Sequence, residues 1–242
     1  MIRRDRRSAW FAWCCALLGG AAGCSQMADL GLDGVLGGAQ PLDERTVVAG
    51  LKEALAIGTE RTVERTHTRD GYLGNALLRI ALPPAVQDLS GTLRSVGLGA
   101  KVDDLAVAMN RAAELAAGEA TALFVETIKG LTLQDAWGIL KGHDTAATDY
   151  FRERTAAALT ARYRPIVQTS LQRVGGYAEY EDLVARIEAL PLLEPPDLDL
   201  VGYVTDRALA GLFTVLGEEE QRIRADPLAR TTALLQRVFG AP

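Results

Sequence analysis

Apolar residues recur at helical spacing along most of the chain. After Asp43, a plausible N-cap, the residues Val47, Leu51 and Leu55 fall on one helical face, with Val48, Ala54 and Ile57 beside them. Pro83-Pro84 can open a second helix, because proline is tolerated in the first helical turn. The next stripes are Val86, Leu89, Leu93 and Val96, and then Val102, Leu105, Ala106, Met109, Ala113 and Ala116. The spacing predicts a series of amphipathic helices.

The same spacing continues through the middle of the chain. In TLQDAWGILKG, Thr132 and Asp135 have the spacing of a capping box, with Asp135 in the place of the usual Glu or Gln. A long stripe follows, and Pro165 within it is expected to kink or split the helix, because proline lacks the N–H donor. The stripe consists of Ala147, Phe151, Leu159, Tyr163, Ile166 and Val167.

The C-terminal quarter predicts three more helices around a proline-rich connector, LPLLEPPDLD. The first carries Leu183, Ile187 and Leu190, and the second carries Val201, Val204, Ala208, Leu212 and Val215. The second continues into GEEEQRIR, where Glu218–Arg222 and Glu220–Arg224 have i,i+4 spacing and predict an exposed, salt-bridged surface. Asp226-Pro227 is typical of a helix start and precedes Leu234, Leu235 and Val238.

Two segments interrupt the helical pattern. RDGYLGN, residues 69–75, breaks it, and ALLRIALPP after it predicts a short extended segment. No segment shows the two-residue alternation of a sheet, and no repeat of fixed period is present. The sequence therefore predicts an all-α fold, an irregular multi-helix bundle in a single domain over residues 43–242.

The N-terminus has the order of a secretory signal peptide. MIRRDRR places four arginines before the apolar run Ala9 to Ala22, which is too short for the roughly 20 residues that span a bilayer. Ala21-Ala22-Gly23-Cys24 then resembles the lipobox of bacterial lipoproteins, although leucine is commoner at the position of Ala21. The resemblance covers residues 1–24 and implies cleavage after residue 23 and lipidation of Cys24.

The lipid would fix the protein to a membrane, because each buried methylene contributes about 0.8 kcal/mol. Ser25 after Cys24 resembles the outer-membrane sorting state, since an aspartate there signals inner-membrane retention. Residues 24–42 are rich in glycine and predict a flexible tether. We therefore expect a lipid-anchored protein of the bacterial cell envelope, at the outer membrane and facing the periplasm.

The cysteine content and the net charge restrict the chemistry and the partners expected for the mature protein. Cleavage before Cys24 would remove Cys14 and Cys15, and lipid would occupy Cys24, so no thiol would remain for catalysis, a disulfide or a zinc site. Loss of residues 1–23 would also take four of the 26 basic and one of the 31 acidic residues, which shifts the net charge from −5 to −8. An acidic surface disfavours nucleic acid as a partner.

GHDTAATDYF, residues 142–151, holds the candidate catalytic residues His143, Asp144, Asp149 and Tyr150. In the simpler interpretation Gly142 ends one helix, Asp144 or Thr145 caps the next, Ala146 and Ala147 allow close packing, and Tyr150-Phe151 enter the core. We favour this interpretation. No spacing of ligands predicts a metal site and no motif predicts a cofactor. The arginines of 152–164 predict a solvated helix face balanced by acids, with an anion groove as the alternative.

Five segments taken in order resemble one bacterial family, catalogued as domain of unknown function 4197. They are IALP, MNRAAE, LQDAWGILKGHDTAATDYFRERT, YVTDRALAGLF and EEEQRIRADPLARTTALLQRVFG. The resemblance extends from about Val47 to Gly240. It implies an α-helical envelope protein, often preceded by a lipoprotein signal, and it brings no activity and no catalytic residues.

Three functions remain open at this point. The leading hypothesis is a non-catalytic module that binds an envelope protein or other envelope component with a helix face or groove. The alternatives are an envelope hydrolase centred on His143 to Tyr150 and a carrier of a hydrophobic ligand between the Ala- and Leu-rich helix faces. The sequence does not determine the oligomeric state.

Overall fold

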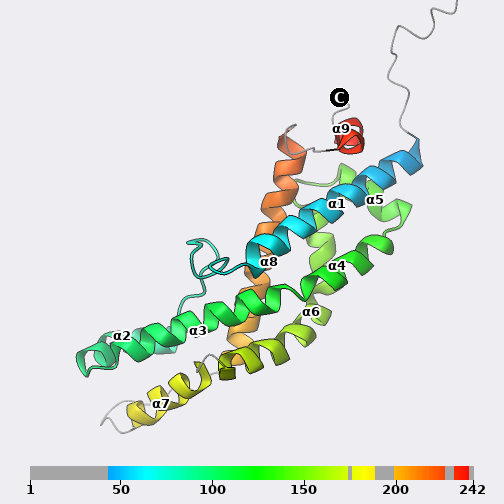
Figure 1. Cartoon of the computed structure of the whole chain (residues 1–242). Helices are drawn as coiled ribbons and strands as arrows, with labels where there is room; N and C mark the ends of the chain where they lie inside the picture. Colours follow the sequence, from blue (N-terminus) through cyan, green and yellow to red (C-terminus); the bar gives the residue numbers. More distant parts are fainter. Residues whose placement is uncertain (1–42, 174–175, 189–198, 227–231, 240–242) are drawn as a thin grey trace, which may run out of the picture. The chain divides into compact units, whose positions relative to one another are not determined.

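Nine α-helices and no β-strand make up the part of the chain that the structure describes. In this computed structural model the described residues are 43–173, 176–188, 199–226 and 232–239, and they belong to one compact unit (Figure 1). The all-α, single-domain fold predicted from the sequence is confirmed. The helices are α1 (Glu44–His67), α2 (Pro84–Ser95), α3 (Gly99–Ala117), α4 (Ala120–Lys129), α5 (Leu133–Lys141), α6 (Ala146–Arg173), α7 (Gly176–Glu188), α8 (Leu200–Ala225) and α9 (Ala233–Phe239).

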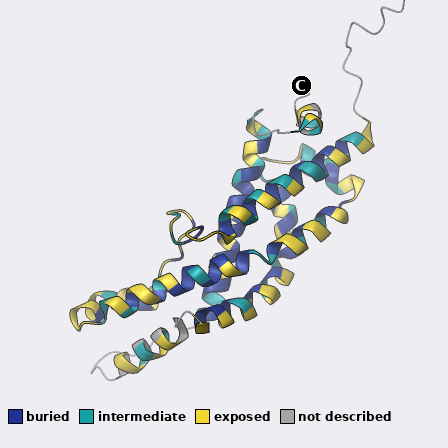
Figure 2. Ribbon diagram, viewed as in Figure 1, coloured by how far each residue is buried: buried dark blue, intermediate teal, exposed yellow. Residues whose placement is uncertain are grey.

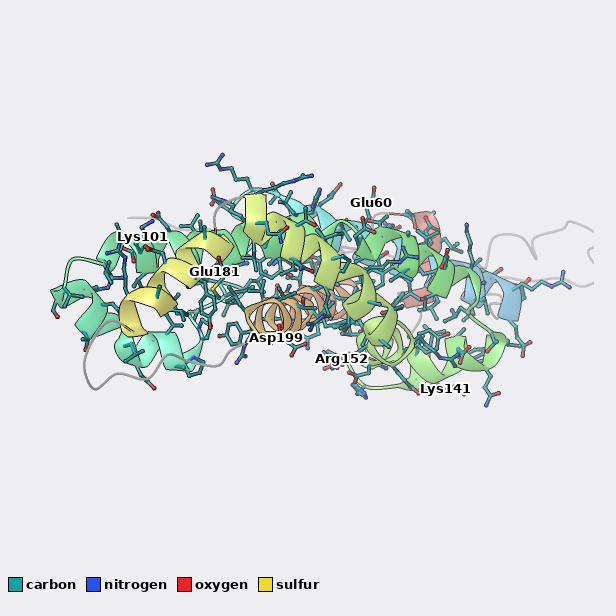
Figure 3. The ribbon with its side chains drawn as sticks, turned by 90° about the horizontal axis from the view of Figure 1, so that it is seen from below. Glu60, Lys101, Lys141, Arg152, Glu181 and Asp199 are labelled. Atoms are coloured by element: carbon teal, nitrogen blue, oxygen red, sulfur yellow. The ribbon has the colours of Figure 1, made fainter. Side chains whose placement is uncertain are left out.

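Helix α8 is the central element of the bundle. It packs against α1, α3 and α6, and Figure 3 looks nearly along its axis. By length and composition α8 could cross a membrane, but 72% of its most apolar 18-residue window is buried inside the domain. The surrounding helices turn their buried faces inward and their exposed faces outward (Figure 2). Packing of the core therefore accounts for the hydrophobicity of α8.

Local signals set several helix ends as predicted. The Asp43 carboxylate accepts the backbone N–H of Thr46 at 2.6 Å, and Thr132 and Asp135 form both hydrogen bonds of the capping box. Pro84 occupies the first turn of α2. Val96, expected on the buried face of α2, follows the last helical residue instead and is 49% exposed.

Some elements differ from the predictions. Helix α4 was not anticipated, although Ala120, Phe124 and Ile128 are buried at four-residue spacing. Helix α6 is not split at Pro165 but runs for 28 residues, with Tyr163 and Val167 buried on either side of the proline. Packing at those two positions compensates for the single backbone hydrogen bond that proline removes. Residues 190–198 of the connector, Pro227 and the side chains of Leu183, Ile187 and Leu235 lie outside the described residues, as do the signal, Cys24 and the tether.

The irregular loop between α1 and α2 is held by two polar side chains of α3. The Asn110 amide accepts the N–H of Ile80 at 2.8 Å and donates to its carbonyl at 2.9 Å, as a neighbouring strand would. One helical turn later, the Glu114 carboxylate accepts the N–H groups of Tyr72 and Leu73 at 3.2 and 3.1 Å. Of the predicted extended segment, residues 76–78 form a turn, and Ile80 pairs with a side chain and not with another strand.

We expect Asn110→Ala to lower the free energy of unfolding by about 2–4 kcal/mol, because a buried peptide group of Ile80 would lose both partners. Chemical denaturation followed by circular dichroism measures the loss. Gln172→Ala, at an exposed position of α6, is the control and should change stability by less than about 0.5 kcal/mol. Equal stability of the two variants would contradict the anchoring role of Asn110.

Candidate functional site

The candidate catalytic residues lie at the junction between α5 and α6. Helix α5 ends at Lys141 with Gly142 as its C-cap, as predicted, and α6 begins at Ala146. A β-carbon at position 142 would lie 2.5 Å from the Ala146 β-carbon, so only glycine fits this close turn. His143 and Asp144 are exposed in the short connection between the helices.

The structure brings His143 and Asp149 together. The His143 Nε2 atom lies 3.3 Å from Asp149 Oδ2, and the Nδ1 atom lies 3.2 Å from the Thr145 hydroxyl. The Thr145 hydroxyl, the His143 imidazole and the Asp149 carboxylate are thus arranged as in a hydrolase triad. The sequence alone did not reveal this arrangement. The backbone N–H of Thr145 also points to Nδ1, at 3.3 Å.

Three features weigh against catalysis by this group. The side chains of His143 and Asp149 are 65% and 49% exposed, so water screens their interaction. Asp149 is also paired with Arg152 at 3.1 Å. The Nδ1 atom that would activate the Thr145 hydroxyl already accepts the Thr145 backbone N–H.

The N–H groups at the start of α6 provide no oxyanion hole. The Ala146 N–H donates to the His143 carbonyl, and the N–H groups of Ala147 and Thr148 donate to the carboxylate of Glu220 at 2.9 and 2.8 Å. The Asp149 N–H donates to the Thr145 carbonyl. All four donors are therefore occupied, whereas acyl transfer needs donors directed at the developing oxyanion.

Asp144 and Tyr150 lie apart from the His143–Asp149 pair. Asp144 makes no hydrogen bond or ion pair with the rest of the described chain. The Tyr150 hydroxyl donates to Asp135 at 3.3 Å, and partial burial and the Asp135 charge raise the pKa of Tyr150. Hydrogen bonds from Thr132 lower the pKa of Asp135. Tyr150 therefore belongs to the capping box of α5, while Phe151 is fully buried, as predicted.

The cap of α6 comes from α8, so the prediction that Asp144 or Thr145 caps this helix is wrong. Besides the two N–H groups, Glu220 accepts the Thr148 hydroxyl at 2.8 Å and is paired with Arg224 at 2.9 Å. Arg224 also donates to the Ile139 carbonyl in the last turn of α5, at 2.7 Å. One Glu–Arg pair of α8 thus holds both helices of the junction.

The residues 218–220 are not the exposed surface that the sequence predicted. The Glu219 side chain is fully buried and is paired with Arg65 at 2.7 Å and with Arg222 at 3.1 Å. Glu218, expected to pair with Arg222, is paired with Arg65 at 2.8 Å. Only the Glu220–Arg224 pair occurs as the i,i+4 spacing predicted, and its carboxylate is 8% exposed. These acids connect α8 to α1 and α6.

The basic stretch of α6 behaves as its favoured interpretation predicted. Arg152, Arg154 and Arg164 are paired with Asp149, Asp135 and Asp199 at 3.1, 3.8 and 3.0 Å. Their side chains are about half exposed. Within the described residues, no group of three or more His, Cys, Asp or Glu side chains could hold a metal ion.

A surface groove of about 310 Å³ lies beside the junction, between the start of α6 and α8. Asp149 and Arg152 line one wall, Phe213 and Gln221 line the other, and the Arg152 guanidinium stacks over the Phe213 ring at 5.1 Å. Arg152, labelled in Figure 3, projects from α6 toward the outside of the bundle. The groove offers charged, amide and aromatic groups together.

The apolar space inside the bundle is far smaller. A cavity of about 30 Å³ between α1, α5, α6 and α8 is lined by Leu51, Leu55, Ile139 and Leu216, among others. By the same measure of volume one water molecule needs roughly 10–15 Å³, so this cavity has room for about two waters and none for a lipid chain.

Comparison with known proteins gives one match. The model of the family described as "Protein of unknown function (DUF4197)" matches residues 41–240, close to the range expected from the sequence segments above. No curated protein and no solved structure matches the chain.

We expect Glu220→Ala to destabilise the protein by about 3–5 kcal/mol, because it leaves two helix N–H groups and Arg224 without their buried acceptor. Thermal and chemical denaturation measure the loss. Asp144→Ala is the matched control, because a local cap would contribute about 1 kcal/mol and an unpaired surface carboxylate almost nothing. A larger loss of stability for Asp144→Ala than for Glu220→Ala would instead support Asp144 as the cap of α6.

Proposed function

The chain belongs to the family described as Protein of unknown function (DUF4197), and we propose that it is a non-catalytic binding module, lipid-anchored in the bacterial cell envelope and facing the periplasm. The observation that carries the proposal is the location of open space. The described chain has grooves of about 310 Å³ and more on its surface, while the apolar cavity within the bundle has about 30 Å³. Such a molecule receives a partner from outside.

The junction chemistry supports the same proposal. Glu220 occupies the helix N–H groups, and both His143 and Arg152 are paired with Asp149, so the donors and the carboxylate of this junction are already engaged. A hydrolase remains the second candidate function, because the His143 imidazole lies 3.3 Å from the Asp149 carboxylate and 3.2 Å from the Thr145 hydroxyl. A hydrophobic-ligand carrier has no comparable observation in its favour.

The anchor rests on the N-terminal residues alone. The charge of MIRRDRR, the short apolar run and Cys24 after small residues support lipidation at Cys24. The tether of residues 24–42, at about 5–6 Å times the square root of its length, would keep the domain within a few tens of ångströms of the membrane. A partner would therefore be met close to the membrane surface.

For the anchor, we expect Cys24→Ala to abolish incorporation of radiolabelled palmitate and to move the protein out of the membrane fraction. The substitution removes the thiol that would carry the lipid, and without acyl chains the protein has no stable anchor. Cys15→Ala, nine residues earlier in the predicted signal, is the control and should keep both the label and the fractionation. Label that persists in Cys24→Ala would rule out lipidation at this residue.

For the binding function, a photoreactive phenylalanine analogue in place of Thr214, an exposed groove residue of α8, should yield a discrete crosslinked species in living cells. The same analogue in place of Leu115, a half-exposed α3 residue outside the described grooves, is the control and should yield none.

The variant His143→Ala, which leaves the groove residue Asp149 in place, separates binding from catalysis. We expect it to retain the Thr214 crosslink and to restore a deletion strain as fully as the wild-type protein does. Restoration that fails while the crosslink and the fold persist would favour the hydrolase. Equal crosslinking from positions 214 and 115 would contradict a partner in the groove.

A further inference from the structure

A second groove, of about 380 Å³, lies between the irregular loop and α8. Residues 77–82 and Gln87 line one side, and Tyr203, Arg207 and Thr214 of α8 line the other. In Figure 1 the loop, drawn in cyan and teal, lies beside α8. Asn110 and Glu114 fix this loop from behind, so the groove has a firm wall.

The groove carries positive charge. Arg79 and Arg207 line it, and no aspartate or glutamate does, although the chain as a whole is acidic. Asp103, outside the lining, interacts electrostatically with Arg79 but is itself paired with Arg94. Neither the Arg79 nor the Arg207 guanidinium makes a hydrogen bond or ion pair with the described chain, and the Arg207 guanidinium stacks over the Tyr203 ring at 5.4 Å. Two guanidinium groups with free donors favour a carboxylate- or phosphate-bearing ligand.

The backbone of the loop offers pairing groups on the same side. Ile80 directs its N–H and carbonyl to Asn110, so the groups of Ala81 point the opposite way, as in a strand. The Ala81 carbonyl accepts the hydroxyl of Tyr203, a groove residue, at 3.1 Å. The Ala81 N–H has no partner in the described chain and is available to a peptide carbonyl.

The groove is long and partly apolar. Its α8 residues Tyr203, Arg207, Ala210 and Thr214 follow one helical face, and Thr214 also lines the groove beside α6. At 1.5 Å per residue, the α8 side of this groove from Tyr203 to Thr214 extends for about 17 Å, enough for about five extended residues. Leu77, 79% exposed, lies at the loop end, where it can contact an apolar side chain.

We propose that the loop–α8 groove binds an extended, acidic segment of a partner protein, with its carboxylates on Arg79 and Arg207 and its backbone along Ala81. The proposal rests on the binding function above and names the class of partner. The two arginines favour acidic side chains in the partner, and the Ala81 N–H favours a peptide backbone. The exposed Leu77 side chain favours an apolar residue in the same segment.

An anionic membrane surface would satisfy the same arginines, but the position of the groove favours the peptide. Helix α1 has 24 residues, so at 1.5 Å per residue it separates Asp43, next to the expected tether, from the loop by about 36 Å. The groove therefore lies far from the residue that follows the expected tether, and the vesicle experiment below tests the membrane directly.

The test measures fluorescence anisotropy of a labelled nine-residue peptide that alternates glutamate and leucine, titrated with the full-length protein in detergent. The expected result is saturable binding that weakens with salt, and a loss of at least about tenfold in affinity for Arg79→Gln/Arg207→Gln, because the variant removes the charge-assisted hydrogen bonds to the peptide carboxylates. Circular dichroism confirms that the variant is folded.

The matched control is Arg162→Gln/Arg173→Gln, which removes the same charge from two exposed arginines of α6 outside the groove and should bind as the wild-type protein does. The same peptide with glutamine in place of glutamate should bind at least about tenfold more weakly. Equal binding by the two double variants, or by the two peptides, overturns the proposal, as does no binding up to about 1 mM.

Binding to lipid vesicles distinguishes an anionic membrane from an acidic peptide as the partner. Liposomes of a neutral phospholipid, with and without an anionic one, are sedimented with the protein carrying Cys24→Ala. Cosedimentation that requires Arg79, Arg207 and the anionic lipid would overturn the peptide proposal in favour of membrane binding. The Thr214 crosslink distinguishes failure of the acidic-peptide proposal from failure of the proposed binding function. A crosslink without peptide binding rejects the acidic partner alone, whereas loss of the crosslink rejects the binding module itself.

Discussion

The carboxylate of Glu220 at the start of α6 is the interaction on which the arrangement of the second half of the domain depends. It accepts two helix N–H groups and a threonine hydroxyl, and its ion-pair partner Arg224 reaches the last turn of α5. A helix N-terminus carries a partial positive charge, and the low exposure of Glu220 makes this complementarity stronger than it would be in water. The orientations of α5 and α6 are therefore set by the central helix.

The same device recurs elsewhere in the domain. Glu114 and Asn110 of α3 satisfy the backbone of the irregular loop, and Glu219 of α8 holds Arg65 of α1. Each of these side chains is buried and fully occupied, so each requires one geometry of its partner. Helix faces rich in alanine and leucine could pack against each other in more than one register. Such polar contacts favour a single arrangement of the helices.

This use of polar groups bears on function. Within residues 142–151, Gly142 and Thr148 help to join two helices, while His143 pairs with Asp149 at the surface. The proposed partner would instead bind along α8. One face of α8 is buried in the core, and the exposed stripe from Tyr203 to Gln221 floors two grooves that meet at Thr214. A rigid floor and a loop pinned from behind suit recognition, because neither must be ordered when a partner binds.

The sequence by itself determined the helical class, most helix faces and the caps at Asp43, Thr132 and Gly142, because periodicity and local caps depend on residues within four positions of one another. Helix α4 carried the same signal in Phe124 and Ile128 and could have been found. Only the tertiary structure decided that Glu220 caps α6 across 72 residues, that Glu219 is buried and that His143 contacts Asp149. A carboxylate that pairs with a distant helix end has the same local sequence as one in a surface i,i+4 pair, so its role is fixed by where the chain folds, not by its neighbours.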